Sequence, residues 1–264
     1  MAVIPLSALD LSLAAALVLM LAGVSTVLHL GLGKRLILSG LRMTLQLLLI
    51  GMVLRQLFAS YNIWLIAGLA LVMVLIAGRE VVVRQRIRVA GFFGYGVGVA
   101  SMSISAFTIS LFSLIVLIQV EPWYTPQYAI PLLGMLLGNT MTGISLALDR
   151  MTSDFYDKRN VVEQRLYLGE TWQSASADIR INAMRTGMIP IMNSMAAAGI
   201  VSLPGTMTGQ ILGGTPPLEA VKYQILILFL IAAGTGFGVV FSIWLTSRNL
   251  FDKRHRFRLE KLKK

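Results

Sequence analysis

The sequence predicts an all-α, polytopic membrane protein with about seven transmembrane helices. The 264-residue chain is 56% hydrophobic and only 13% charged, whereas soluble domains average about 25% charged residues. Its apolar residues gather in long runs, several of which reach the roughly 20 residues needed to cross a bilayer core. A membrane barrel would instead show alternating segments of about 10 residues, so the runs are predicted to be helices.

The apolar runs follow one another along the whole chain, and residues 1–264 are expected to form one membrane domain. The first run lacks the basic beginning of a secretory signal and is too long for its apolar core, so it is predicted to be a span. The third run is short, and Val81–Val83 is expected to extend it. The seven predicted spans are Leu6–Leu30, Leu36–Phe58, Ile63–Ala77, Gly91–Val120, Tyr128–Leu148, Gly187–Leu212 and Ala220–Thr246.

The basic residues between the runs predict the orientation. All Lys and Arg residues fall on one side of the predicted helices, except Arg42, Arg55 and Lys222. Because Lys and Arg favour the cytosolic side, we expect the N-terminus outside and the C-terminus inside, as an odd number of spans requires. The net charge of +11 therefore reflects membrane topology, and no nucleic-acid partner is expected.

No catalytic chemistry is predicted for this chain. It has no G-x-x-x-x-G-K-[ST] motif to hold nucleotide phosphates, so any ATP hydrolysis must occur on a partner. It has no cysteine, and His29 and His255 are its two histidines. We expect no catalytic residue, no cofactor and no metal site. The 14 methionines could ligate Cu(I), but thioethers more often fill adaptable cores.

Polar residues within three of the runs suggest a pathway through the membrane. Pro204 and Gly205 are expected to break the sixth run, and such breaks are tolerated inside protein or beside a wet cavity. The alternatives are that Arg42 reaches the cytosolic interface and that the amide and hydroxyl groups join neighbouring helices. The candidate pathway residues are Arg42, Gln46, Asn139, Thr142, Asn193, Met195, Pro204, Gly205, Thr208 and Gln210.

Glycine pairs at GxxxG spacing occur in three of the runs. Such pairs let helix backbones approach closely, so they are interpreted mainly as packing sites and only secondarily as dimerisation sites. The pairs are Gly94/Gly98, Gly134/Gly138 and Gly234/Gly238.

The cytosolic loop 149–186 is the only sizeable segment predicted to lie outside the membrane. Two short helices are expected in it, the first over Asn160–Leu168 and ended by Gly169. The second is expected to be capped by Thr171 and to run toward Arg185. The loop is either a solvated connector or a docking element for a soluble partner.

Several stretches resemble the FetB family of ABC-transporter permeases, which includes bacterial iron-export permeases and plant aluminium-tolerance half-transporters. The similar stretches are VSLPGTMTGQILGGTPPLEAVKYQ at Val201–Gln224, LLGMLLGNTMTG in the fifth run and GLRMTLQLLLIGMVL at Gly40–Leu54. The resemblance implies a permease of the bacterial inner membrane that exports iron or a related metal. It also implies a separate ATPase subunit, in a complex of two permeases and two ATPases.

The resemblance further implies that the cytosolic loop couples the permease to its ATPase. The residues expected to take part are Leu168, Gly169, Glu170, Thr171, Ala175 and Asp178. The spans lack the carboxylate and imidazole groups that iron prefers, so the metal would cross as a chelate, or the substrate would be an organic molecule. From the residues alone, a secondary transporter or channel and a seven-span sensor or receptor stay open as alternatives.

Overall fold

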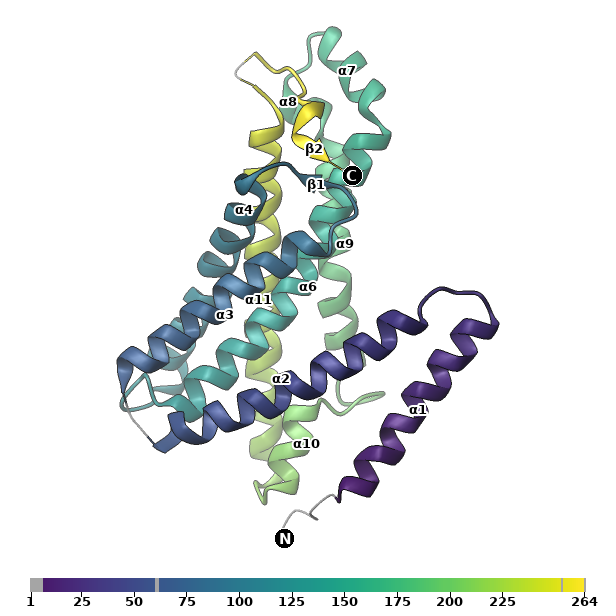
Figure 1. Ribbon diagram of the computed structural model, residues 1–264. Coiled ribbons are helices and arrows are strands. Elements are labelled where there is room, and N and C mark those ends of the chain that lie inside the picture. The colour runs from purple at the N-terminus through teal and green to yellow at the C-terminus, as the bar shows by residue number, and fades with distance from the viewer. Residues whose placement is uncertain (1–6, 60–61, 253, 264) are drawn as a thin grey trace. The chain divides into compact units, whose positions relative to one another are not determined.

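The computed structural model describes residues 7–59, 62–252 and 254–263, and these are mainly helical (Figure 1). The chain divides into two compact units, residues 1–62 with 212–215, and residues 63–211 with 216–264. Six helices in the described part are long and apolar enough to cross a membrane. They are α1 (Ala8–Val27), α2 (Gly33–Ala59), α3 (Ile63–Val83), the continuous helix over residues 92–118, α6 (Pro126–Asp157) and α11 (Pro217–Leu250).

The first unit is a hairpin of α1 and α2. A capping box begins α1, in which the Asp10 backbone N–H donates to Ser7 Oγ and the Ser7 N–H donates to the Asp10 carboxylate. The two helices meet closely where α2 begins, because a Cβ on Gly33 would lie 3.1 Å from the carbonyl oxygen of Ala22. The first two predicted spans are helices: α1 is shorter than the predicted Leu6–Leu30, whose first residue lies outside the described residues, and α2 includes all of the predicted Leu36–Phe58.

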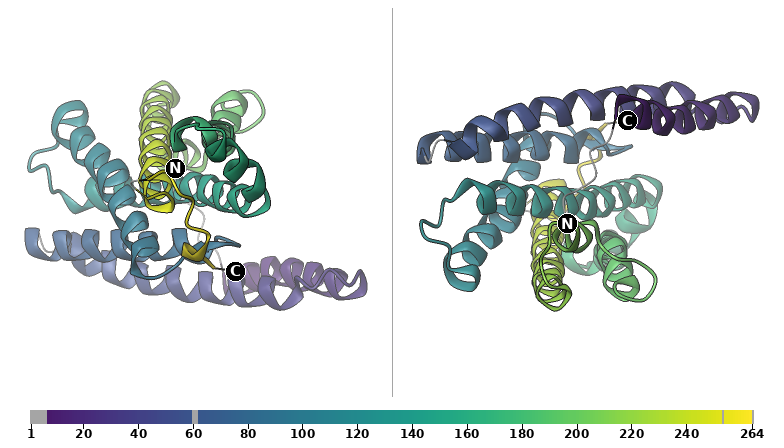
Figure 2. Two further views of the ribbon diagram at one scale, coloured as in Figure 1. Left: turned by 90° about the horizontal axis from the view of Figure 1, so that it is seen from above. Right: turned by 90° about the horizontal axis from the view of Figure 1, so that it is seen from below.

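The core of the second unit lies among α3, α6, α9 (Ala177–Ala197), α11 and the helix over residues 92–118. Figures 1 and 2 show α6, α9 and α11 side by side. Fully buried side chains at their contacts include Leu136, Ile144 and Met151 of α6 and Ile243 of α11. Because α3 continues to Val83, the predicted extension of the third span is confirmed.

Glycines allow the closest contacts between these helices. A Cβ on Gly187 of α9 would lie 2.7 Å from the carbonyl oxygen of Gly143 on α6. The packing role predicted from GxxxG spacing is confirmed for Gly98, whose Cβ position meets the Gly78 carbonyl oxygen, and for Gly238, which contacts Ser105. No atom of another helix lies within 4 Å of the Cβ position of Gly138, so its predicted packing role stays a prediction.

The fourth predicted span is one continuous helical segment with two π-helical stretches. It consists of α4 (Phe92–Met102), η1 (Ser103–Phe107), α5 (Thr108–Phe112) and η2 (Ser113–Ile118). A π-turn shifts the backbone hydrogen bonds from i−4 to i−5 carbonyls. Here the Thr108 hydroxyl follows the same spacing, since its Oγ1 donates to the carbonyl oxygen of Ser103 at 3.2 Å. The π stretches were not predicted.

The sixth predicted run is broken, but earlier than expected. Helix α9 ends at Ala197, and α10 (Gly205–Leu212) begins after an ordered turn. In the turn Gly199 has φ +82°, which suits glycine, and the N–H groups of Val201 and Ser202 both donate to the carbonyl oxygen of Ala197. The break is thus confirmed, whereas the structure does not show seven continuous spanning helices in its described residues.

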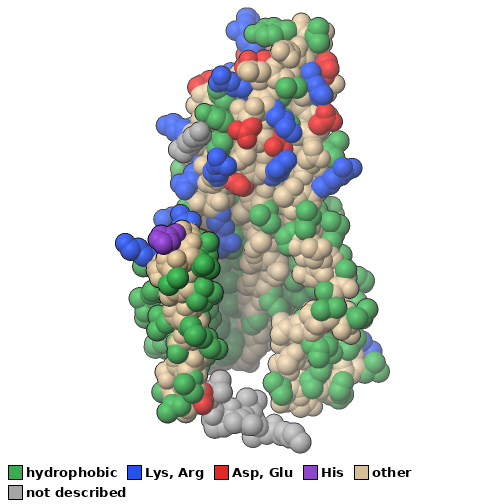
Figure 3. Space-filling view, turned by 90° about the vertical axis from the view of Figure 1, so that its right-hand side faces the viewer, with side chains coloured by type: hydrophobic (Ala, Val, Ile, Leu, Met, Phe, Trp, Pro, Cys, Tyr) green, Lys and Arg blue, Asp and Glu red, His purple; other side chains and the backbone are tan. Residues whose placement is uncertain are grey.

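The predicted cytosolic loop 149–186 is largely helical, and the long helices on either side extend into it. Helix α6 continues to Asp157, helped by an ion pair between Arg150 and Asp154 at 3.0 Å, and α9 already begins at Ala177. Between them lie α7 (Arg159–Tyr167) and α8 (Trp172–Ala175). Charged side chains gather over the end of the second unit formed by these elements (Figure 3).

The C-terminal tail folds back onto this charged end. Strand β2 (Leu262–Lys263), preceded by η3 (Leu259–Lys261), pairs antiparallel with β1 (Arg88–Val89). Phe251 and Phe257 pack on the fully buried Phe155 of α6, with ring centroids 5.8 and 5.6 Å away. Only the charge of the tail entered the predictions, and its packing against α6 and β1 was not predicted.

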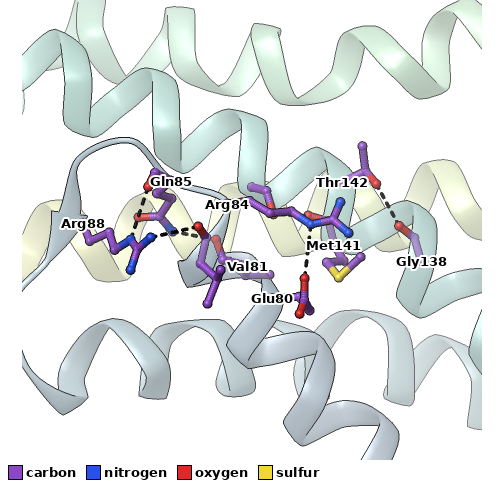
Figure 4. A network of polar contacts seen from close by, with 10 residues as sticks. Glu80, Val81, Arg84, Gln85, Arg88, Gly138, Met141 and Thr142 are labelled. Atoms are coloured by element: carbon purple, nitrogen blue, oxygen red, sulfur yellow. Dashed lines mark hydrogen bonds and ion pairs between the residues drawn. The ribbon is translucent and has the colours of Figure 1, made fainter. Parts of the chain in front are cut away.

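The connection between α3 and β1 is also tied to α6. Figure 4 shows polar contacts at the end of α3, where Glu80 and Arg84 form an ion pair at 3.7 Å. Beyond it, the Arg86 N–H donates to Asp149 Oδ1 at 2.5 Å. The Thr152 hydroxyl donates to a carbonyl oxygen of the same connection at 2.8 Å. These bonds join the charged ends of α3 and α6.

Candidate functional site

A polar hollow lies where α9 breaks. It has a volume of about 570 Å³ and lies among α6, α9, the turn, α10 and α11. None of the described residues that line it is charged. They are Met135, Asn139, Ile191, Ser194, Ser202, Pro204, Gly205, Thr206, Gln224, Ile227, Leu228 and Ile231. The structure thus brings together Asn139, Pro204 and Gly205, three of the residues predicted for a pathway.

The polar side chains of the hollow bond mainly to their own helices. Asn139 Nδ2 donates to the carbonyl oxygen of Met135 at 2.8 Å, and Ser194 Oγ donates to that of Pro190 at 2.9 Å. Such bonds to the i−4 carbonyl satisfy a polar group in an apolar helix. An amide offers two donor hydrogens and two acceptor lone pairs, so one bond leaves Asn139 able to bind a ligand.

Four polar residues of the hollow were not among the predicted pathway residues, namely Ser194, Ser202, Thr206 and Gln224, and Gln224 is the most buried of them. It is 7% exposed, and its Oε1 accepts a hydrogen bond from the hydroxyl of Thr206. This bond connects α10 to α11 next to the broken helix. The available signal was that Gln224 is the only amide in the apolar run Ala220–Thr246, because an amide at that depth needs a partner.

Five further predicted pathway residues of the second unit do not line the hollow. Thr142 Oγ1 donates to the carbonyl oxygen of Gly138 at 3.0 Å (Figure 4), and Thr208 Oγ1 donates to that of Pro204 at 3.3 Å. Asn193 and Met195 are exposed on α9, and Gln210 is half-buried on α10. Arg42 and Gln46 belong to the first unit, where both lie on α2.

The α7–α8 hairpin presents an apolar tip. Tyr167 and Leu168 are 87% and 85% exposed, and the chain turns at Gly169, whose φ is +90°. The predicted helix stop at Gly169 is therefore confirmed. Glu170 accepts a hydrogen bond from Ser174 Oγ at 2.8 Å, which orders the residues after the turn. A large exposed apolar tip at a charged surface is typical of a contact site.

The hairpin is joined to the start of α9. Thr171 caps α8 as predicted, with the Ser174 N–H donating to its Oγ1 at 3.4 Å, while Ala175 is buried. Asp178 of α9 forms an ion pair with Arg165 of α7 at 3.1 Å. Ala175 and Asp178 therefore support the hairpin from within rather than forming its exposed tip.

The tail completes this surface. The Trp172 N–H donates to His255 Nδ1 at 3.3 Å, and the Trp172 ring stacks on Phe251 with centroids 5.6 Å apart. The Arg180 guanidinium lies over the same ring at 5.4 Å, and burial lowers the pKa of Arg180 from its usual value. Hairpin, tail and the first turn of α9 thus form one packed surface, which we call the hairpin surface.

The donor groups of the hollow suit neutral polar ligands. Its described lining offers amide, hydroxyl and thioether groups. No group of three or more His, Cys, Asp or Glu side chains suited to a metal ion occurs in the described parts of the chain. The hollow can therefore donate and accept hydrogen bonds but lacks the carboxylate and imidazole groups of a transition-metal site.

Six apolar helices of spanning length and a polar hollow beside a broken helix define a multi-pass α-helical membrane protein. A profile described as "Uncharacterised protein family (UPF0014)" matches residues 8–251. The chain belongs to this family.

Three relatives place the chain more closely. It is 43% identical over 206 residues to the UPF0014 membrane protein slr1647 of Synechocystis, covering 76% of this chain and 77% of the relative. It is 36% identical over 245 residues to the Arabidopsis thaliana protein ALUMINUM SENSITIVE 3, covering 92% and 88%. It is 29% identical over 263 residues to the probable iron export permease protein FetB of Escherichia coli, covering 97% and 96%. No solved structure matches the chain.

Proposed function

We propose that the chain is the transmembrane permease subunit of an ATP-driven exporter, energised by a separate ATPase subunit that binds the hairpin surface. The observation that carries this proposal is the link between hairpin and hollow. The exposed tip at Tyr167 and Leu168 belongs to a hairpin ion-paired to α9, and α9 runs without interruption to the break at the hollow. Movement of the hairpin by a partner would therefore be transmitted along one helix.

The proposed topology has seven crossings, with the N-terminus outside and the C-terminus inside a bacterial inner membrane. The crossing that is not one continuous helix, the sixth along the chain, is formed by α9, the turn and α10 together. Helix α9 leaves the charged end of the second unit and α11 returns to it, so the intervening turn must lie toward the opposite side. The concentration of Lys and Arg around the hairpin and tail supports a cytosolic position for that end.

The proposed assembly contains two permeases and two ATPases. In it Leu168, Gly169 and Glu170 contact the ATPase, since Leu168 and Gly169 are exposed at the turn of the hairpin and the half-buried Glu170 follows them directly. Thr171 maintains α8 through its cap, and Asp178 maintains the connection to α9. The probable iron export permease of Escherichia coli, similar over 97% of this chain, supports an export role.

The proposed cargo is iron-related and crosses the membrane in complexed form or as a polar organic molecule. A bare ferric ion needs hard, charged ligands, and the described lining of the hollow supplies neutral amides and hydroxyls. The same groups suit a ligand that carries its own oxygen atoms. Under this proposal Asn139, Thr206 and Gln224 bind the cargo by hydrogen bonds.

The test compares two exposed leucines. The variant Leu168→Asp changes the hairpin tip, where Leu168 is 85% exposed. The control Leu218→Asp changes a leucine that is 70% exposed, in the first turn of α11 and far along that helix from the tail. Both variants would be purified in mild detergent from the native host, and the co-purifying proteins identified by mass spectrometry. We expect a P-loop ATPase with the unchanged chain and with Leu218→Asp, and its loss with Leu168→Asp.

Two results would contradict the proposal. Recovery of the folded, unchanged chain without any ATPase would favour a secondary transporter, in which case Arg42 would be the next residue to change. Equal ATPase recovery with both leucine variants would remove the hairpin tip from the docking site.

A further inference from the structure

An apolar groove runs along the outer face of α11. It has a volume of about 700 Å³ and is separate from the polar hollow. Its walls are residues of η1, α5 and α11, namely Ile104, Thr108, Ile109, Phe112, Phe237, Val240, Phe241 and Trp244. Phe112 and Phe237 are 50% and 66% exposed, so the groove is open and lined by aromatic rings.

The groove has a local cause in the fourth helix. Its wall from Ile104 to Phe112 lies in the π-helical η1 and in the short α5. The second π-helical stretch, η2, follows directly. A π-turn inserts one residue and rotates the following side chains relative to an α-helix. A polar group in this wall is satisfied internally, because the Thr108 hydroxyl bonds to Ser103. The wall therefore presents an apolar, irregular surface instead of a regular helix ridge.

An arginine lies beyond one end of the groove. Trp244 lines the groove and also a second hollow, whose other residues are Trp172, Gln173, Arg248, Phe251 and Asp252. The Arg248 guanidinium lies over the Trp244 ring at 5.6 Å. The Asp252 carboxylate, the opposing charge in this hollow, accepts hydrogen bonds from the N–H groups of Arg254 and Arg256, both at 2.8 Å. The Asp252 carboxylate is thus hydrogen-bonded to the backbone of the tail.

The distance from Phe237 in the groove to Arg248 beyond its end matches one leaflet of a bilayer. Phe237 and Arg248 are eleven positions apart on α11, which corresponds to about 16 Å at 1.5 Å per residue. Half of a bilayer hydrocarbon core is about 15 Å. We propose that this groove is a binding site for an anionic phospholipid, whose acyl chain lies between Phe237 and Trp244 and whose phosphate is bound by Arg248.

Charge complementarity selects this occupant. Arg248 lies at the end of α11 that the proposed topology places in the cytosol, where anionic lipids are concentrated. A guanidinium held over an indole ring binds phosphate oxygens while the ring packs against the first methylenes of the chain. The site depends on the proposed orientation but not on the nature of the cargo or on the ATPase.

The test measures lipid retention by the full chain. The detergent-purified protein would be titrated with phosphatidylglycerol or with phosphatidylcholine of the same acyl chains, and bound lipid counted by native mass spectrometry. One arginine near a phosphate surface corresponds to about a fivefold preference. We therefore expect roughly fivefold tighter retention of phosphatidylglycerol, lost in Arg248→Gln and kept in Arg159→Gln, which changes an exposed arginine of α7.

A second pair of variants tests the groove itself. Val240→Trp fills the groove and should abolish retention of both lipids, whereas Ile225→Trp, at an exposed position of α11 outside the groove, should retain them. Equal retention of the two lipids by the unchanged chain would overturn the proposal. A second result would also overturn it: the unchanged chain is a dimer, and Val240→Trp makes it a monomer without altering lipid retention. The groove would then hold a second copy of the chain.

Discussion

Adding one methyl group at Gly187 tests the close contact between α6 and α9. In Gly187→Ala the new Cβ would lie 2.7 Å from the Gly143 carbonyl oxygen, 2.8 Å from Ala147 Cβ and 3.0 Å from Val239 Cγ2. Ordinary van der Waals contact begins at 3.4 Å, so three neighbours on two helices must each move by several tenths of an ångström. Overpacking of this kind costs about 1–3 kcal/mol.

A matched variant removes the contribution of helix propensity. Alanine is favoured over glycine within a helix by up to about 1 kcal/mol, and Gly138→Ala gains this term without a clash, because no atom lies within 4 Å of its Cβ position. Thermal unfolding in mild detergent should give Gly187→Ala a Tm several degrees below that of Gly138→Ala. Equal Tm values for the two variants would refute the described approach of α9 to α6.

Two further predictions concern the tail. Phe155→Ala removes a fully buried ring that packs against both Phe251 and Phe257, and it should cost about 3–5 kcal/mol, lowering the Tm and exposing the tail to protease; an unchanged Tm would contradict this packing. The backbone N–H of Arg256, helped by that of Arg254, lowers the pKa of Asp252. The contribution of Asp252 to stability is therefore present above the unfolded carboxyl pKa of about 3.9 and lost as pH falls through the lower folded value. Hydrogen exchange of residues 252–258 should rise in that acidic range, and Asp252→Asn should abolish this dependence; a variant with the same pH profile would argue against it.

The long helices could be predicted from hydropathy because a spanning helix needs one continuous apolar segment. This reasoning located α1, α2, α3 and α6 and the helix over residues 92–118. It also located the interruption of the sixth run through Pro204 and Gly205. It placed the break several residues late, because the helix already ends at Ala197 and Gly199 adopts a positive φ.

Contacts between segments that are distant in the chain could not be predicted from the sequence. Strands β1 and β2 are two residues each and carry no periodic pattern, so their pairing had no signal. The bond between Thr206 and Gln224 joins α10 to α11 and depends on how the turn orients α10. Asn139, Pro204 and Gly205 were found because polar or helix-breaking residues are rare at membrane depth, whereas Asn193 and Gln210 meet the same criterion and do not line the hollow.

The pairing of β2 with β1 has a consequence for biosynthesis. Arg88 and Val89 follow the third apolar helix, but their partners Lys263 and Leu262 are translated only after α11. Since a strand pair cannot close before both strands leave the ribosome, the connection between α3 and α4 waits for its partner through most of synthesis. Residues made after α11 thus complete the folding of a segment made much earlier, and removing β2 would leave the β1 edge unpaired.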